Sequence, residues 1–266
     1  MTLVPLPQFL AWIVRDWSRR SISLSQPGYI ESILDNFAMR DYNPSSMSMD
    51  EGLKLSVQMS PNTPEEKKRM PYRELIGKLL YLTEATRHDI AYVFGALCHF
   101  LENPGKDHWL AAKRVLRSHN GTVHLELVYP HTVSPDLFTT YANSDLSGYP
   151  DNSRSTGGFA ICVGGATTQW GSRLQPHVPL SSTESEDTTL AKVGCEMMWM
   201  RYLFEDLSYD VSRPSLLLVD NKSSIQVAKH PENQSTMKHV HRRIRDHIDQ
   251  GVSRYLISLG ETSQPY

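Results

Sequence analysis

The second half of the chain carries oxygen-bearing side chains where predicted strands end and where a predicted helix begins. Asn143 and Asp145 follow one apolar strand, and Asp220 closes another. Glu186 lies near the start of a long helix. Such side chains converge when the strands are neighbours, and two divalent ions about 4 Å apart need several carboxylate oxygens to hold them. Because hard cations such as magnesium select oxygen ligands, the pattern favours a metal-dependent phosphodiester hydrolase.

Each of these residues also has a purely structural interpretation. Glu186 follows Thr183 by three residues, which is the spacing of a helix capping box. Asp220 precedes a predicted helix and is a candidate N-cap, and Asp145 lies in a turn-rich run. Residue types alone therefore leave both interpretations open.

The elements that must position these residues form an α/β pattern. Short β-branched or aromatic runs predict strands at 137–142, 156–163, 167–172 and 216–219. Apolar residues at three- and four-residue steps predict helices at 183–207, 223–229 and 237–250. This order indicates a mixed sheet with helices on its faces. We expect Trp170, Trp199 and Tyr202 in its core.

The first half of the chain is predicted to be a hairpin followed by helices. The strands are expected at 9–14 and around Ile22 and Leu24, and the helices at 29–37, 72–83, 88–101 and 106–118. Residues 44–64 are rich in Pro and Ser, which predicts an irregular surface connection with poor order. A change of pattern between Pro130 and Pro135 predicts domains at 1–135 and 136–260, with a tail at 261–266.

Composition limits the possible partners and compartments. The chain has 266 residues, with 27 Lys and Arg against 29 Asp and Glu, so nucleic-acid contact would depend on local basic patches. Cys98, Cys162 and Cys195 are far apart and odd in number, which favours a reducing compartment. The apolar stretch at 9–14 is too short for a signal peptide or membrane span. We therefore expect an intracellular protein, cytoplasmic or nuclear, without a membrane partner.

Two basic clusters are candidate contacts for a nucleic-acid backbone. Lys113, Arg114 and Arg117 lie along one predicted helix. Arg242, Arg243 and Arg245 lie along another, near the end of the chain. Solvated helix faces explain most groups of this kind, so the structural alternative stays open for both.

Several motifs in order resemble the ribonuclease H domain of copia-type retrotransposon Pol polyproteins. They are 141–148 (YANSDLSG), 154–158 (RSTGG), 181–186 (SSTESE), 219–224 (VDNKSS) and 238–240 (KHV). Upstream, 72–77 (YRELIG) and 85–92 (ATRHDIAY) resemble the segment that follows the polymerase palm in that family. The resemblance spans roughly residues 9 to 259. It implies a five-stranded ribonuclease H-like fold after a connection segment, as one piece of a larger polyprotein.

The resemblance also implies an activity and a site. The family's domain hydrolyses the RNA strand of RNA:DNA hybrids with magnesium. The resemblance therefore implies Glu186 and Asp220 as metal ligands. The position of the family's first catalytic aspartate is occupied by Asn143 in this chain, and the family's last acidic position is occupied by His241. The second aspartate of the first motif is retained as Asp145. We therefore expect magnesium binding to be weak or lost and catalysis to be impaired. The polymerase motif Tyr-Val-Asp-Asp does not occur in this sequence, so polymerase activity is not expected.

Two alternatives to an impaired enzyme remain. The chain could be a non-catalytic module that binds hybrid or other nucleic acid, or an inactive transposon relic. Hybrid cleavage separates an enzyme from a binding module, and salt-dependent binding separates a module from a relic.

Overall fold

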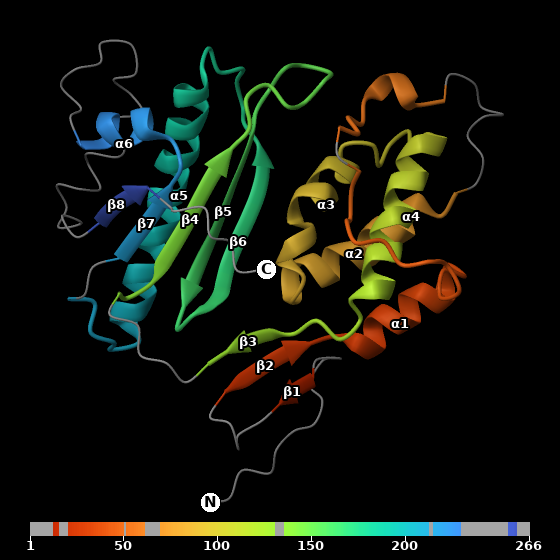
Figure 1. Ribbon diagram of the computed structural model, residues 1–266, viewed down its shortest axis with the longest axis horizontal. Helices are drawn as coiled ribbons and strands as arrows, with labels where there is room; N and C mark the ends of the chain where they lie inside the picture. Colours follow the sequence, from red (N-terminus) through yellow and green to blue (C-terminus); the bar gives the residue numbers. More distant parts are fainter. Residues whose placement is uncertain are drawn as a thin grey trace, which may run out of the picture. The chain divides into compact units, whose positions relative to one another are not determined.

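The chain forms two compact units, residues 1–131 and 132–266. The computed structural model describes residues 13–15, 21–50, 52–61, 70–130, 136–212, 215–229 and 255–259. Each unit has its own sheet and its own helices (Figure 1).

Helices dominate unit 1, and they follow the apolar periodicity of the sequence. They are α1 (Pro27–Asn36), α2 (Tyr72–Ala85), α3 (Ala91–Cys98) and α4 (Lys106–Gly121), with short 3₁₀ turns at η2 (Val57–Met59) and η3 (His88–Ile90). Proline at the first position of α1 suits a helix start, where no backbone N–H is needed. The helix predicted at 88–101 is divided into η3 and α3. The buried faces of α2, α3 and α4 contain Leu79, Leu97 and Val115, respectively.

A small antiparallel sheet completes unit 1. The predicted hairpin is present as β1 (Ile13–Arg15) and β2 (Ile22–Ser25), and residues 9–12 lie outside the described ranges. No local sequence pattern predicted the third strand, β3 (Leu127–Tyr129), which pairs Leu127 with Leu24. Its partner lies about a hundred residues earlier in the chain, beyond the reach of any local pattern.

The described part of the irregular segment, residues 43–50 and 52–61, is anchored to α4, so the expectation of poor order in this part of 44–64 is wrong. The Arg117 guanidinium donates to the Asn43 carbonyl at 2.7 Å, and Ser45 N donates to the Arg117 carbonyl at 3.1 Å. His108 Nδ1 accepts from Gly105 N at 2.9 Å, and its other ring nitrogen lies 3.1 Å from the Ser56 carbonyl. Side chains of α4 thus replace the regular backbone pairing that the segment lacks.

Unit 2 contains a five-stranded mixed sheet with the order β6-β5-β4-β7-β8. Its strands are β4 (Thr139–Ser144), β5 (Thr156–Val163), β6 (Ala166–Leu174), β7 (Ser215–Val219) and β8 (Tyr255–Leu259). The first three are antiparallel, and β7 pairs parallel with both β4 and β8. The predicted α/β class and mixed sheet are confirmed. The local pattern did not locate β8, and the helix predicted at 237–250 lies outside the described residues.

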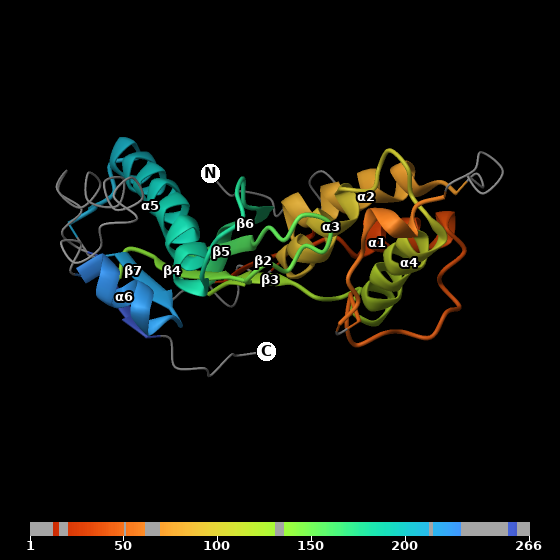
Figure 2. The same ribbon diagram turned by 90° about the horizontal axis from the view of Figure 1, so that it is seen from above.

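Helix α5 (Ser182–Asp206) covers one face of this sheet, and α6 (Lys222–Lys229) follows β7 (Figure 2). The core between α5 and the sheet contains Phe138, Ile161, Val193, Met197 and Leu217. Two residues expected in the core are instead exposed: Trp199 by 55% and Tyr202 by 53%. They fall outside the stripe of α5 that faces the strands, because a helix buries only the positions that recur on one side.

Candidate functional site

The capping of α5 leaves Glu186 free of a capping role. The N-cap is Ser181, whose hydroxyl accepts from Glu184 N at 3.1 Å. Glu184 in turn accepts from Leu180 N at 2.7 Å. The cap is therefore formed by Ser181 and Glu184, two residues before the predicted pair of Thr183 and Glu186, so that prediction is wrong. Glu186 projects from the next turn of the helix.

Glu186 lies against the end of β4. One carboxylate oxygen, Oε1, accepts from Ser144 N at 3.0 Å. The other, Oε2, is buried and has no hydrogen-bond partner among the described residues, and the side chain is only 4% exposed. Burial raises the pKa of Glu186, the Ser144 hydrogen bond opposes this, and the negative charges of Asp220 and Asp187 raise it further. The site therefore holds a carboxylate that would gain from a nearby positive charge.

Asp220 and Asn143 end neighbouring parallel strands. Strands β4 and β7 pair Tyr141 with Leu218, and extending that register by two residues sets Asn143 level with Asp220. Both residues are exposed. The cap of α6 is Asn221, whose Oδ1 accepts from Ser223 N at 2.9 Å, so the N-cap alternative for Asp220 does not hold. Asn143, Glu186 and Asp220 thus come from the three elements that meet at this end of the sheet.

Asp145 organises the loop between β4 and β5. Its Oδ1 accepts from Thr156 N at 2.6 Å, and its carbonyl accepts from the Ser185 hydroxyl at 2.8 Å. A Cβ added at Gly148 would lie 2.0 Å from Asp145 Oδ2, so the carboxylate rests directly on that glycine. These contacts match the turn interpretation of Asp145.

Asp187, the residue after Glu186, was not predicted from the sequence as part of the site. Its side chain is 1% exposed, and neither carboxylate oxygen has a hydrogen-bond partner among the described residues. Burial, with a contribution from Glu184, raises the pKa of Asp187 to about 6, although the nearby Ser224 hydroxyl opposes the shift. The helical spacing could have predicted its burial, because Asp187 precedes Leu190 by three residues and therefore lies on the buried face of α5.

The described part of the site has few side chains that could bind a metal ion. Within the described ranges, no three His, Cys, Asp or Glu side chains are grouped so that they could hold a metal ion. Glu186 and Asp220 supply two carboxylates. His241 and the basic residues Arg242, Arg243 and Arg245 lie outside the described ranges.

Three basic residues of α4 contact the segment at 42–50. Lys113 Nζ lies 4.8 Å from the centroid of the Tyr42 ring. Arg114 forms an ion pair with Asp50, and Arg117 donates to the Asn43 carbonyl. Within unit 1 these three cations therefore have an anchoring role.

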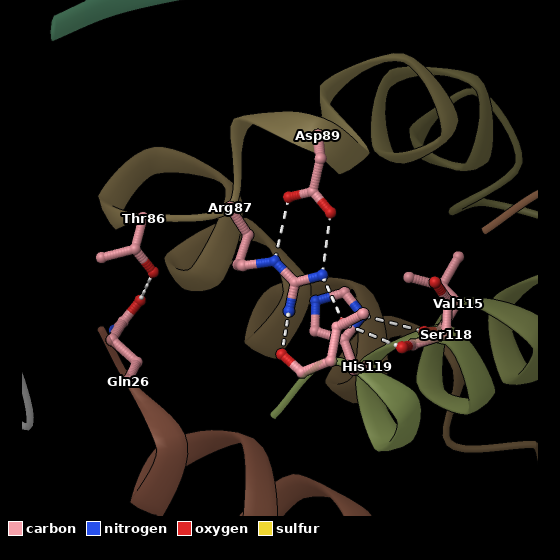
Figure 3. Close-up of polar contacts among 8 residues, drawn as sticks. Gln26, Thr86, Arg87, Asp89, Val115, Ser118 and His119 are labelled. Atoms are coloured by element: carbon pink, nitrogen blue, oxygen red, sulfur yellow. Dashed lines mark hydrogen bonds and ion pairs between the residues drawn. The ribbon is translucent and has the colours of Figure 1, made fainter. Parts of the chain in front are cut away.

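A polar cluster around the buried Arg87 joins the η3 turn to the C-terminal part of α4 in unit 1 (Figure 3). Arg87, 1% exposed, donates to both carboxylate oxygens of Asp89 at 2.9 and 2.8 Å and to the Thr122 hydroxyl at 2.8 Å. His119 Nδ1 lies 2.8 Å from the Val115 carbonyl, and burial and the Arg87 charge lower the pKa of His119 to about 4. Arg87 and Asp89 belong to the upstream motif at 85–92, and their contacts give that motif a structural role.

Comparison with known proteins identifies the family. The chain is 36% identical over 254 residues to the retrovirus-related Pol polyprotein from transposon TNT 1-94 of Nicotiana tabacum, covering 93% of this chain and 19% of that protein. It is 30% identical over 240 residues to the Pol polyprotein from transposon RE2 of Arabidopsis thaliana, covering 88% of this chain and 16% of that protein. The chain therefore belongs to the copia-type retrotransposon Pol polyproteins and spans less than a fifth of the length of these relatives.

The five-stranded mixed sheet of unit 2 agrees with the ribonuclease H-like fold that the sequence resemblance implied. A solved structure of LC11-RNase H1, isolated from compost, is 12% identical and has a TM-score of 0.38. The match covers 48% of this chain and 86% of that one. No protein-family model matches the chain. None of the described helices combines the length and the apolar character that crossing a membrane requires.

Proposed function

We propose that residues 136–260 form a ribonuclease H-type domain that binds RNA:DNA hybrid, with hydrolysis of the RNA strand as its ancestral reaction and with impaired turnover in this chain. The observation that supports it most is the buried, unpartnered Oε2 of Glu186 beside the charge of Asp220. An unpaired buried carboxylate oxygen is costly unless a ligand binds there. Residues 1–135 would be the connection segment that precedes this domain.

The donor set fits one hard cation better than two. Glu186 and Asp220 offer carboxylate oxygens, which magnesium prefers. Asn143 offers only a neutral amide at the position level with Asp220. Magnesium, when bound at Glu186 and Asp220, would activate a water molecule and stabilise charge on the phosphodiester. We propose that it binds weakly, because two ions bring about four positive charges to a site that has lost carboxylates.

The protein residues in this scheme have distinct tasks. The Ser144 backbone N–H holds Glu186 through Oε1 and leaves Oε2 available. Asn143 can orient a ligand by hydrogen bonding but cannot balance its charge. Selection of hybrid would come from duplex shape and from 2′-hydroxyl contacts across the wide minor groove.

A non-catalytic hybrid-binding module is the second candidate function. The exposed amide of Asn143 favours it, since it removes the charge that a metal-dependent reaction needs and reduces repulsion with Asp220. In either case the chain would act as one piece of a larger intracellular Pol polyprotein, cytoplasmic or nuclear.

Cleavage of an end-labelled RNA:DNA hybrid in magnesium tests the proposal. We expect little or no cleavage by the unmodified chain and a gain with Asn143→Asp plus His241→Asp. Glu186→Gln in that background should abolish the gain and serves as the matched control. Robust cleavage by the unmodified chain that Asn143→Asp leaves unchanged would contradict the proposed impairment. Salt-dependent hybrid binding without any gain of cleavage would favour the binding module.

A further inference from the structure

Four large apolar side chains lie on the side of α5 that faces away from the sheet. Trp199, Tyr202 and Leu207 are each more than half exposed, and Leu203 is about one-third exposed. They recur at three- and four-residue steps, so they share one face of the helix and its C-cap, called here the outer face. The other side of α5 packs against β4 and β5 (Figure 2). The outer face therefore contributes nothing to the core of unit 2.

The composition of the outer face is typical of a protein interface. Single exposed apolar side chains are ordinary on a protein surface, but neighbouring ones mark places where another molecule binds. Trp and Tyr are also the residues that most often dominate the binding energy of an interface. Trp199 and Tyr202 are one turn apart, so they would enter such an interface together.

The outer face has a positive charge at one end and a negative charge at the other. Lys192 precedes Trp199 by seven residues and Asp206 follows it by seven, and both are exposed. Seven residues are close to two helical turns, so each charge lies about 10 Å from Trp199 along the same face. Glu196 lies near Lys192, but its carboxylate already accepts from Gln169 Nε2 at 2.6 Å.

This arrangement is complementary to a second copy of itself. If two α5 helices pair antiparallel about a twofold axis at Trp199, Lys192 of each copy lies opposite Asp206 of the other. A parallel pair would instead place like charges together. A twofold interface needs one patch that matches itself, with its apolar part at the centre and its charges at the rim. The outer face meets both requirements.

We propose that a second copy of this chain docks on the outer face of α5, with the two helices antiparallel and the two Trp199 side chains at the twofold axis. The paired length from 192 to 206 is about 21 Å. Such a contact buries roughly 500 Å² of each copy, which is at the low end of specific interfaces, so the dimer is weak and its dissociation constant is about micromolar or higher. Glu186 lies about 20 Å along the helix from Trp199, so the dimer leaves the candidate catalytic site open.

Sedimentation velocity of the full chain across a concentration series tests the proposal. We expect the unmodified chain to shift from monomer to dimer as its concentration rises to about 200 μM, in keeping with a weak interface. Trp199→Glu should weaken the dimer at least tenfold. Leu110→Glu changes a leucine of α4 that is similarly exposed and is the matched control, which should dimerise like the unmodified chain. Thermal melting verifies that each variant is folded. A chain that stays monomeric throughout, or a dimer that Trp199→Glu leaves unchanged, would overturn the proposal.

Charge reversal tests the antiparallel pairing. Lys192→Glu and Asp206→Lys should each weaken self-association several-fold, because each places two pairs of like charges across the axis. A mixture of the two single variants should restore dimerisation, since every pair across the axis is then of opposite sign. The two residues are about 21 Å apart within one copy, so the recovery cannot arise inside a single chain. No gain on mixing would reject the antiparallel arrangement.

A disulfide trap tests the register. The twofold axis at Trp199 sets the exposed Cys195 of one copy opposite Leu203 of the other. In a Cys98→Ala/Cys162→Ala background, Leu203→Cys should give an intermolecular disulfide on mild oxidation. Adding Cys195→Ala is the control and should abolish the disulfide, because two copies of position 203 lie about 12 Å apart along the helices, too far for a disulfide. Cross-linking that persists without Cys195 would contradict this register and the proposal with it.

Discussion

Glu186 Oε1 accepts a hydrogen bond from Ser144 N at 3.0 Å, which ties the second turn of α5 to the last residue of β4. The contact joins residues that are 42 positions apart in the chain. It fixes one oxygen of the carboxylate and leaves the other buried and unpartnered. The structural contact and the proposed ligand-binding role thus belong to different atoms of one side chain, and they can be tested separately.

Substitutions at Glu186 should separate these two roles. Glu186→Gln keeps an oxygen that can accept from Ser144 N and removes a buried charge, so we expect unchanged or slightly increased stability in metal-free buffer. Glu186→Ala leaves Ser144 N without its partner and should lower the free energy of unfolding by about 1–3 kcal/mol. Urea unfolding of both variants measures the difference. Equal losses for Gln and Ala would show that the hydrogen bond contributes little.

Asp187 should make unit 2 more stable at mildly acidic pH. The pKa of Asp187 is about 6 in the folded chain, against an ordinary value of 3.8 for an aspartate. A raised folded pKa means that the folded state binds the proton more tightly, so the stabilisation is full below about pH 4 and is lost as pH rises through 6. Asp187→Asn should recover roughly 2 kcal/mol at pH 8 in metal-free buffer and little at pH 4. Unfolding of unit 2, followed from pH 4 to pH 8, provides the measurement, and a pH-independent effect of the substitution would exclude this account.

His119 should give unit 1 the opposite dependence on pH. The pKa of His119 is about 4 in the folded chain, against an ordinary value of 6.5 for a histidine, because burial and the neighbouring Arg87 disfavour the imidazolium. The unfolded state then binds more protons, so stability is lost as pH falls from 6.5 towards 4. The loss should reach roughly 3 kcal/mol. Hydrogen exchange of α4 amides between pH 7 and pH 4.5 would report it, and His119→Gln should flatten the profile.

The pair of Arg87 and Asp89 should matter more than the exposed pair of Arg40 and Asp35. The Arg87 side chain is 1% exposed, so Asp89→Asn leaves a buried cation without its counter-charge. Removing a partner from a fully buried pair costs about 3–5 kcal/mol, and we expect about 2 kcal/mol here because Asp89 is 41% exposed. Asp35→Asn is the matched control and should change the melting temperature little, since both of its side chains are about half exposed. Equal effects of the two substitutions would show that burial of Arg87 is not decisive.

Two glycines of unit 1 should respond oppositely to alanine. A Cβ at Gly105 would lie 1.8 Å from the Met59 carbonyl oxygen, so Gly105→Ala must displace backbone and should cost about 2 kcal/mol. Gly77 lies inside α2 with nothing within 4 Å of an added Cβ. Gly77→Ala should therefore stabilise the unit by about 0.5–1 kcal/mol through its helix propensity. Thermal melts of the two variants check both signs, and a stable Gly105→Ala would show that the 52–61 segment can move away from α4.

The sequence by itself determined the elements with strong local signals. Periodicity located α5 to within one residue at each end and predicted β5 at the bounds it has. Ordered motifs carried the resemblance to the copia-type family, which the comparisons confirm. Local patterns succeed here because helix and strand periodicities are imposed by the nearest neighbours in the chain.

Only the tertiary structure decided which side chains share a surface. Strand β3 depends on a partner far away in sequence, and the capping of α5 by Ser181 left Glu186 free to reach β4. The packing of α5 on the sheet buries the Asp187 carboxylate without a hydrogen-bond partner among the described residues. The same packing places Lys192 near Arg173. These relationships join residues on different elements, and their energies depend on burial and on neighbouring charges, which no window of sequence contains.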